Sequence, residues 1–326
     1  MKRGLITWDK TELPPDAFES RIEAARNSLA ERDLPAVVIY TDIWKSNQGR
    51  HFTNFMPYWN RALIVLPREG APVLLCALSP RVYPWIRSVT ILDEIRPSGN
   101  LVEKLLEMCS EKSWNRIGVL DLARLPADLY LPVLAGKIEA EDVPSSDVWP
   151  VLDQWELSMH RRAAQLARRV LAEEFQKAAG CVDHQFAGRL ERAFRRAGAE
   201  DLVILMTNGQ TSPAPPTGRK IGEQSSVMVA LEYRGHWIKL SRPHPSSIVA
   251  ASLESLFRNS IKDSGAGLNT SVYLESLSGP FPYESCEQAD LATGKLFALH
   301  IELQADNHRL FYGDTCRRGQ EGAELL

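Results

Sequence analysis

Cysteine is scarce in this chain and is scattered along it. The five cysteines are odd in number, and none of them forms a Cys-x-x-Cys pair. They are Cys76, Cys109, Cys181, Cys286 and Cys316. Neither a disulfide framework nor a zinc ribbon is therefore expected. Reduced thiols are typical of a cytoplasmic protein, and this is the location that we expect.

Long apolar runs and an excess of charge are also missing. No stretch approaches the roughly 20 apolar residues of a membrane-spanning helix, and the first residues lack the apolar stretch of a signal peptide. The net charge is −3 and the pI is about 6.2. No general basic field would draw such a chain to nucleic acid or to an anionic membrane, and we expect neither as a partner.

What the chain does have is ample material for a buried core. It contains 326 residues, of which 44% are hydrophobic, and this size favours two domains over one. A segment rich in turn-forming residues, residues 143–150, separates two regions of different pattern. We therefore predict one domain over residues 1–150 and a second over residues 151–326.

The first region alternates helical and strand patterns. An apolar stripe from Phe18 to Leu29 has helical spacing, and residues 101–108 also indicate a helix. Short apolar runs typical of strands occur at residues 37–40, 62–66, 72–76, 89–92 and 117–120. The second and third runs flank a turn and indicate a hairpin. The predicted fold class of this region is α/β with mixed strands.

The second region begins with a long amphipathic helix. Its apolar stripe runs from Leu157 to Ala178, and Gly180 is expected to end it. Asp183 is expected to cap a second helix. Further elements are predicted as strands at residues 202–205 and 296–303 and as a helix at residues 248–261.

The most informative segment is residues 227–242, which indicate a β-hairpin. Strand alternation places Met228, Ala230 and Glu232 on one face of its first strand. The same alternation places Trp237, Lys239 and Ser241 on one face of the second strand. Residues 232–236, followed by Ser241-Arg242, resemble the metal-binding hairpin of the creatinase/prolidase/aminopeptidase P family, which has the pita-bread fold.

Weaker motifs resemble the same family, and they occur in the family's order. They lie at residues 51–55, 156–164, 291–297, 300–302 and 321–326. The resemblance implies an α/β (α+β) fold, with a creatinase-like N-terminal α/β domain over residues 1–150. It implies a shortened pita-bread domain over residues 151–326.

The departures from the family concern its metal site. The family's metalloenzymes hold two divalent ions with two Asp, one His and two Glu, which are hard ligands suited to such ions. Met228 and Lys239 stand at the two Asp places, and Glu302 stands at the first Glu. The second Glu falls near Gly313, and residues 268–284, where the His would lie, contain no histidine. We expect no metal and no other cofactor.

Creatinase, which works without a metal, resembles this chain in lacking both aspartates. Its histidine base would fall close to Pro213, and one of its carboxylates would fall near Leu240 or Ser241. Neither group is present, so the creatinase reaction cannot be carried over intact.

Two residues are the predicted catalytic pair. If the family geometry holds, Lys239 replaces the charge of the metal and pairs with Glu302, and the two act as acid and base. A carboxylate buried without a counter-charge is costly or becomes protonated, which favours such a pair. The competing interpretation is a solvated surface lysine. His300 is expected on the same strand face as Glu302 and could reach the pocket, with a packed structural histidine as the competing interpretation.

Six further residues complete the predicted substrate-binding set. Arg219 and Arg242 match basic positions near the family's pocket and could hold a carboxylate in bidentate fashion, although surface solvation is equally open. The remaining candidates are Met228, His236, Trp237 and Tyr283. A structural role is the competing interpretation for His236.

Two functions follow from these residues. The first is a metal-independent, creatinase-like hydrolase or lyase that acts on a C–N bond of a small polar molecule. The second is a catalytically inactive pita-bread protein that binds a ligand or a partner. The resemblance also implies a homodimer, in which His51 and Arg61 of one subunit would reach the pocket of the other.

Overall fold

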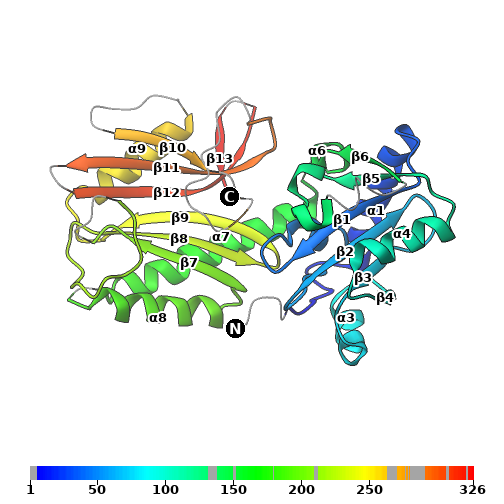
Figure 1. Ribbon diagram of the computed structural model, residues 1–326. Helices are drawn as coiled ribbons and strands as arrows, with labels where there is room; N and C mark the ends of the chain where they lie inside the picture. Colours follow the sequence, from blue (N-terminus) through cyan, green and yellow to red (C-terminus); the bar gives the residue numbers. More distant parts are fainter. Residues whose placement is uncertain are drawn as a thin grey trace. The chain divides into compact units, whose positions relative to one another are not determined.

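The computed structural model divides into two compact units, Lys2–Pro150 and Val151–Leu326 (Figure 1). It describes residues 6–130, 138–149, 152–178, 180–208, 212–262, 270–275, 277, 279, 291–305, 308–320 and 322–326. Each unit is built around its own sheet. No helix among these residues is long and apolar enough to cross a membrane.

The N-terminal unit contains a six-stranded sheet in the order β4-β3-β2-β1-β5-β6. Its strands are β1 (Ala36–Asp42), β2 (Arg61–Pro67), β3 (Val73–Cys76), β4 (Glu94–Pro97), β5 (Arg116–Leu120) and β6 (Glu139–Val143). Its helices are α1 (Pro15–Glu31), α2 (Asn47–Thr53), α3 (Tyr83–Val89), α4 (Leu101–Glu111) and α6 (Ser145–Val148). The β1, β2 and β3 strands pair in antiparallel fashion, whereas β4, β5 and β6 add parallel pairs. The prediction of a mixed α/β unit is confirmed.

Helices cover both faces of this sheet. Ile22 and Leu29 of α1 pack on one face with Ile39 of β1. Leu105 of α4 packs on the other face with Val38. Because β1 is buried on both faces, its sequence is a continuous apolar run without alternation.

The strand predicted at residues 89–92 is wrong. The helix α3 runs to Val89, and the next strand begins only at Glu94. Thr90 ends the helix, because its hydroxyl donates to the carbonyl of Ile86 and accepts from the N–H of Leu92. Val89 and Leu92 of this run are buried at a helix exit, where strand pairing is not needed to satisfy the backbone.

The C-terminal unit contains a seven-stranded sheet in the order β10-β11-β12-β9-β8-β7, with β13 paired to β12. Its strands are β7 (Asp201–Met206), β8 (Ser226–Tyr233), β9 (His236–Pro243), β10 (Thr270–Glu275), β11 (Leu296–Ala305), β12 (His308–Arg318) and β13 (Ala323–Leu325). Its helices are α7 (Gln154–Phe175), α8 (Asp183–Arg196) and α9 (Ala250–Lys262). All neighbouring strands are antiparallel.

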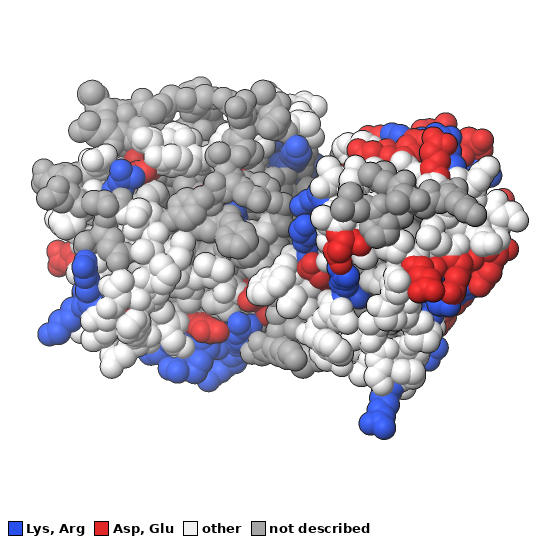
Figure 2. Space-filling model, viewed as in Figure 1, with Lys and Arg blue, Asp and Glu red and all other residues white. Residues whose placement is uncertain are grey.

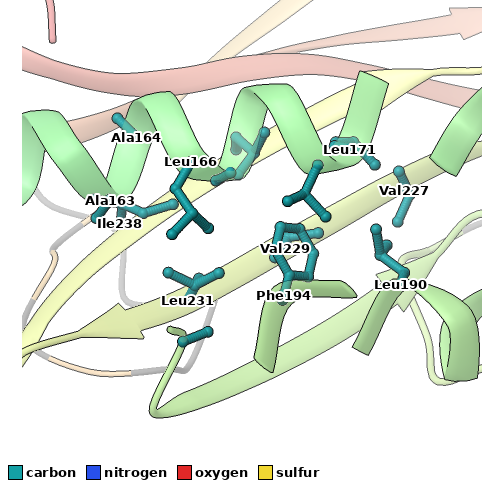
Figure 3. Packing of buried hydrophobic residues seen from close by; sticks show 14 of the residues in the cluster. Ala163, Ala164, Leu166, Leu171, Leu190, Phe194, Val227, Val229, Leu231 and Ile238 are labelled. Carbon is teal, nitrogen blue, oxygen red and sulfur yellow. The ribbon is translucent and has the colours of Figure 1, made fainter. Parts of the chain in front are cut away.

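The helices cover one face of this sheet. The long helix α7 begins with a capping box between Asp153 and Glu156 and lays its apolar stripe against β8 and β9. Figure 3 shows Leu166 and Leu171 of α7 close to Val229 of β8, with Leu190 and Phe194 of α8 completing the cluster. At the other end of the sheet, α9 packs on β11 and β12.

The predicted hairpin is formed by β8 and β9. They are joined by a two-residue turn at Arg234 and Gly235, which both have positive φ (52° and 84°). Such a turn fits the twist of paired strands. The register pairs Met228 with Ser241 and Ala230 with Lys239, so these side chains share the sheet face that α7 and α8 leave uncovered.

Candidate functional site

A cavity of about 330 Å³ opens on the uncovered face of the C-terminal sheet. Met228 and Phe311 give it apolar walls. Its polar groups come from Glu275 of β10, His300 and Glu302 of β11, and Arg309 of β12. The strand register places these residues on one face of the sheet. Glu275 is aligned with Ala298, and His300 and Glu302 follow Ala298 at two and four residues along β11. Phe311 is aligned with Glu302, and Arg309 is two residues from Phe311 on β12.

The strand register aligns Lys239 with a carboxylate. Residues that are aligned across neighbouring strands form a rung. In one such rung, Glu275 pairs with Ala298, and Ala298 pairs with Thr315. Thr315 hydrogen-bonds to the backbone of Lys239. The Nζ of Lys239 therefore lies 3.3 Å from Oε2 of Glu275, and the two residues are only 2% and 6% exposed.

Glu275 is a buried carboxyl group with an unusual pKa. Burial raises its pKa to about 7, and the nearby Lys239 opposes this only in part. The ammonium of Lys239 lies against Oε2 at 3.3 Å and is the partner of this oxygen. The Glu275 side chain also lines the cavity.

The predicted pairing of Lys239 with Glu302 is corrected by this register. Glu302 lies four residues beyond Ala298 on β11 (298 to 302), which corresponds to about 13 Å along the strand. Its carboxylate instead lies 3.1 Å from Nε of Arg309, and the hydroxyl of Tyr273 also hydrogen-bonds to it. Lys239 is buried, so the interpretation as a solvated surface lysine is wrong as well.

His300 is the second buried titratable group in the cavity. Its Nδ1 lies 2.8 Å from the hydroxyl oxygen of Ser241, and its Nε2 has no partner among the described residues. Burial lowers its pKa to about 3, and the cations of Lys239 and Arg242 add to this effect. The imidazole is therefore neutral at physiological pH.

Gly313 makes room for this imidazole. A Cβ at that position would lie 2.3 Å from Nδ1 of His300 and 2.6 Å from the carbonyl oxygen of Leu299. The ring therefore occupies the space above Gly313, close to where the resemblance placed the family's second metal-binding glutamate.

This face does not fit a pair of divalent cations. A buried ammonium group lies at one expected ligand place, an imidazole covers another, and Glu302 is bound by Arg309. No group of three or more His, Cys, Asp or Glu suited to a metal occurs within the described part of the chain. The donor set therefore does not match the two hard, carboxylate-rich ions of the family's metalloenzymes.

The other predicted binding residues that the structure describes do not line the cavity. Arg242 is on the helix-covered side, where Nη2 lies 2.6 Å from Asp314 and the guanidinium stacks over Tyr312. Arg219 is exposed and does not line the cavity. His236 and Trp237 lie at the turn end of the hairpin, where His236 packs against His160. Tyr283 lies outside the described residues.

The two contributors expected from a second subunit are engaged within the N-terminal unit. His51 is 5% exposed, and its ring stacks on Trp149 with centroids 3.8 Å apart. The expected contribution of His51 to another subunit's pocket stays a prediction. Arg61 is half-exposed and pairs with Asp128 at 2.5 Å.

Two cavity residues, Glu275 and Arg309, were missed by the sequence interpretation. Glu275 lies within residues 268–284, where a histidine was sought and no other ligand was considered. Its alternation with Tyr273 in one strand is the signal that could have identified it, because both residues face the cavity. Arg309 has no comparable local signal.

The cavity rim is anchored by Asp183. Its carboxylate accepts hydrogen bonds from the backbone N–H groups of Thr217 and Gly218, at 3.0 and 2.8 Å. Burial acts to raise the pKa of Asp183, but these hydrogen bonds outweigh it and the pKa is lowered. The predicted capping role is wrong, since the N-cap of α8 is Val182 and Asp183 holds the loop that follows Pro213 at the rim.

The basic face of α8 is an ordinary charged surface. Figure 2 shows basic side chains along the edge of the C-terminal unit where α8 lies. Arg195 pairs with Glu191 at 3.2 Å, and Arg189 pairs with Glu174 at 3.5 Å. Part of the positive charge is thus neutralised within the chain, which fits a solvated surface.

Comparison with known proteins relates the fold to solved structures. No family model matches the chain, and no curated protein matches it. An X-Pro aminopeptidase from Thermotoga maritima superimposes with a TM-score of 0.71 at 15% identity, covering 93% of this chain and 96% of that chain. A prolidase from Pyrococcus horikoshii gives a TM-score of 0.70 at 11% identity, covering 94% and 97%.

A third solved structure comes from a protein of a different kind. The N-terminal domain of the FACT complex subunit SPT16 from Eremothecium gossypii matches with a TM-score of 0.59 at 13% identity, covering 95% of each chain. At such identities the shared property is the fold. The chain therefore has the pita-bread fold of prolidases over nearly its whole length, as the sequence resemblance implied.

Proposed function

We propose that this chain is a metal-independent hydrolase or lyase that acts on a C–N bond of a small polar molecule held in the cavity. One observation carries the proposal. Two buried titratable groups, Glu275 and His300, line the same cavity, and Nε2 of His300 has no hydrogen-bond partner among the described residues. Buried polar atoms are almost always satisfied, so this nitrogen points to a bound polar molecule beside Glu275.

Glu275 is the proposed acid and base. A pKa of about 7 leaves both its protonated and its ionised forms populated near neutral pH, which is the condition for efficient proton transfer. For hydrolysis, the carboxylate takes a proton from water while the water oxygen bonds to carbon. The C–N bond then breaks, and Glu275 returns the proton to the leaving nitrogen.

His300 is proposed to orient the substrate. If the hydroxyl of Ser241 donates to Nδ1, the ring carries its proton on Nε2 and donates into the cavity. A neutral imidazole can polarise a carbonyl in this way without giving up a full charge. The low pKa of His300 keeps it in that neutral form.

Lys239 acts through Glu275 in this proposal. The space beside it holds only about 10 Å³, which is room for about one water molecule. A substrate carbon therefore does not reach Nζ. The ammonium group instead favours the ionised form of Glu275 and so limits how far burial raises its pKa.

A second function, ligand or partner binding without catalysis, is favoured by a separate observation. A subunit of a complex shares this fold, and Met228, Phe311 and Pro213 give the cavity a substantial apolar lining. Such a protein would bind a ligand through the same cavity residues without turnover.

A screen of small amides, ureas and guanidino compounds distinguishes the two functions. Binding is measured by thermal shift, and turnover is measured by release of ammonia or amine. With a substrate found, we expect E275Q to lower kcat at least 100-fold, because it removes the proton-transfer group. We expect E302Q to lower kcat less than tenfold.

Two outcomes of this screen would contradict the proposed catalytic role of Glu275. Binding without release of any nitrogen compound supports the non-catalytic function. Loss of turnover in E302Q with retention in E275Q would return the catalytic role to Glu302. Thermal unfolding of both variants shows whether each retains the fold.

A further inference from the structure

The mouth of the cavity carries a guanidinium group that is only partly used. The side chain of Arg309 is 37% exposed, and its Nε lies 3.1 Å from Oε1 of Glu302. Within the described part of the chain, its terminal nitrogens make no other ion pair or hydrogen bond. A guanidinium has five N–H donors in a fixed fork, so the terminal edge is available to a ligand.

The polar groups of the cavity follow one another along β11 and β12. Arg309 is aligned with Gln304 at one end of this row. Glu302 and then His300 come next along β11, and Glu275, which is aligned with Ala298, is at the other end. Glu302 and His300 are two positions apart on β11, which is about 7 Å along the strand. A cation held at Glu302 is therefore one small molecule's length from Nε2 of His300 and from the carboxyl group of Glu275.

The charges around the cavity favour a singly charged anion. Glu302 is 5% exposed and Glu275 is 6% exposed, and each lies beside one cation, Arg309 or Lys239. A dianion such as phosphate would face both carboxylates, whereas a carboxylate brings one charge and a planar shape. Arginine binds such a group in bidentate fashion.

We propose that Arg309 determines the specificity of the site by binding a carboxylate of the ligand. The substrate class is then a small acid whose carboxylate lies on Arg309 and whose C–N group lies against His300 and Glu275. This inference rests on the proposed function for the location of the ligand. It replaces Arg219 and Arg242 as anion-binding candidates, because neither of these lines the cavity.

Glu302 is expected to weaken the binding of an anionic ligand to Arg309. Its carboxylate positions the guanidinium by bonding to Nε, and it also competes for the positive charge. Replacing it with glutamine removes the competing charge and keeps an oxygen for Nε. The affinity for an anionic ligand should therefore rise, whereas a merely structural role for Glu302 would not raise it.

Two matched probes test the proposal by titration calorimetry on the full chain. N-acetylglycine carries an amide and a carboxylate, and N-acetylglycinamide is its neutral counterpart. We expect the wild type to bind N-acetylglycine at least tenfold more tightly, as a charge-assisted pair provides. R309Q should reduce this preference to less than twofold. E302Q should strengthen the binding of N-acetylglycine about three- to tenfold and leave N-acetylglycinamide unchanged.

The double variant E302Q/R309Q removes both charges and controls for the buried carboxylate that R309Q leaves alone. It should show the same lack of preference as R309Q. The proposal is overturned if the preference survives in R309Q, if E302Q weakens the binding of N-acetylglycine, or if neither probe binds the wild type.

Failure of the proposed function gives a different result. An Arg309-dependent preference without turnover of any compound refutes the enzymatic function and leaves the specificity intact. Turnover of neutral compounds without an anion preference refutes the specificity and leaves the enzymatic function intact.

Discussion

At the scale of single residues, Lys239 is a buried cation held beside the carboxyl group of Glu275. Its place on the pocket face follows from the alternation of β9, and its burial beside a carboxylate follows from the cost of isolated buried charges. The partner could not be predicted, because it depends on the register of β10 against β11. That register brings Glu275 onto the rung of Lys239 and leaves Glu302 four residues further along β11.

The pKa of Glu275 leads to a stability prediction of definite sign. Burial raises it from an ordinary 4.5 to about 7 in the folded protein. The fold tolerates the protonated carboxyl group better than the ionised one. The free energy of unfolding is therefore unaffected by this group below about pH 4.5, and it falls as the pH rises through about 7. Between pH 5 and 8, we expect the wild type to lose roughly 1–3 kcal/mol that E275Q does not lose.

Urea unfolding followed by circular dichroism measures this difference. E254Q is the control, because Glu254 lies on α9 and forms a half-exposed ion pair with Arg258. The control should follow the wild type across this pH range. Equal pH dependence in wild type and E275Q would contradict the assignment of the buried carboxyl.

At the scale of secondary-structure elements, the hairpin of β8 and β9 was predictable and its surroundings were less so. Alternation and an Arg-Gly turn are local signals, and both are present in residues 227–242. The run at residues 89–92 lacked such a signal, because apolar β-branched residues occur equally in a buried helix exit. Asp183 was assigned to the nearest helix because its true partners, Thr217 and Gly218, are distant in sequence.

Gly313 gives a prediction about the packing of β11 on β12. An alanine there would press its Cβ against His300 and against the carbonyl of Leu299, which cannot move freely. We expect G313A to lower the free energy of unfolding by about 1–3 kcal/mol and to displace the imidazole. G222A is the matched control, because a Cβ at Gly222 meets nothing within 4 Å. Equal unfolding midpoints for the two variants would refute this account.

At the scale of the whole molecule, the order of weak motifs was enough to predict the pita-bread fold. No single motif fixes a fold, but their order follows the order of the elements, and the solved structures cover nearly the whole chain. The candidate site was only half predicted. Met228, Lys239 and Glu302 came from the family's ligand positions, whereas Glu275 and Arg309 match none of those positions and are brought to the cavity by strand register.

The prediction that this chain holds no dinuclear metal site is testable on the purified protein. A dinuclear site needs several hard ligands close together, and here Lys239 introduces a buried positive charge on the same face. A divalent ion would have to displace the ammonium group and would face electrostatic repulsion from it. We expect mass spectrometry of the purified protein to find less than about 0.1 equivalent of Mn, Fe, Co or Zn. We also expect EDTA to shift the melting temperature by less than about 1 °C, because no bound metal contributes to folding.

K239M removes the charge without adding a ligand and should also remain metal-free. Stoichiometric metal in the wild type would refute the rebuilt site, whereas metal uptake only in K239M would show that the ammonium charge alone had excluded it.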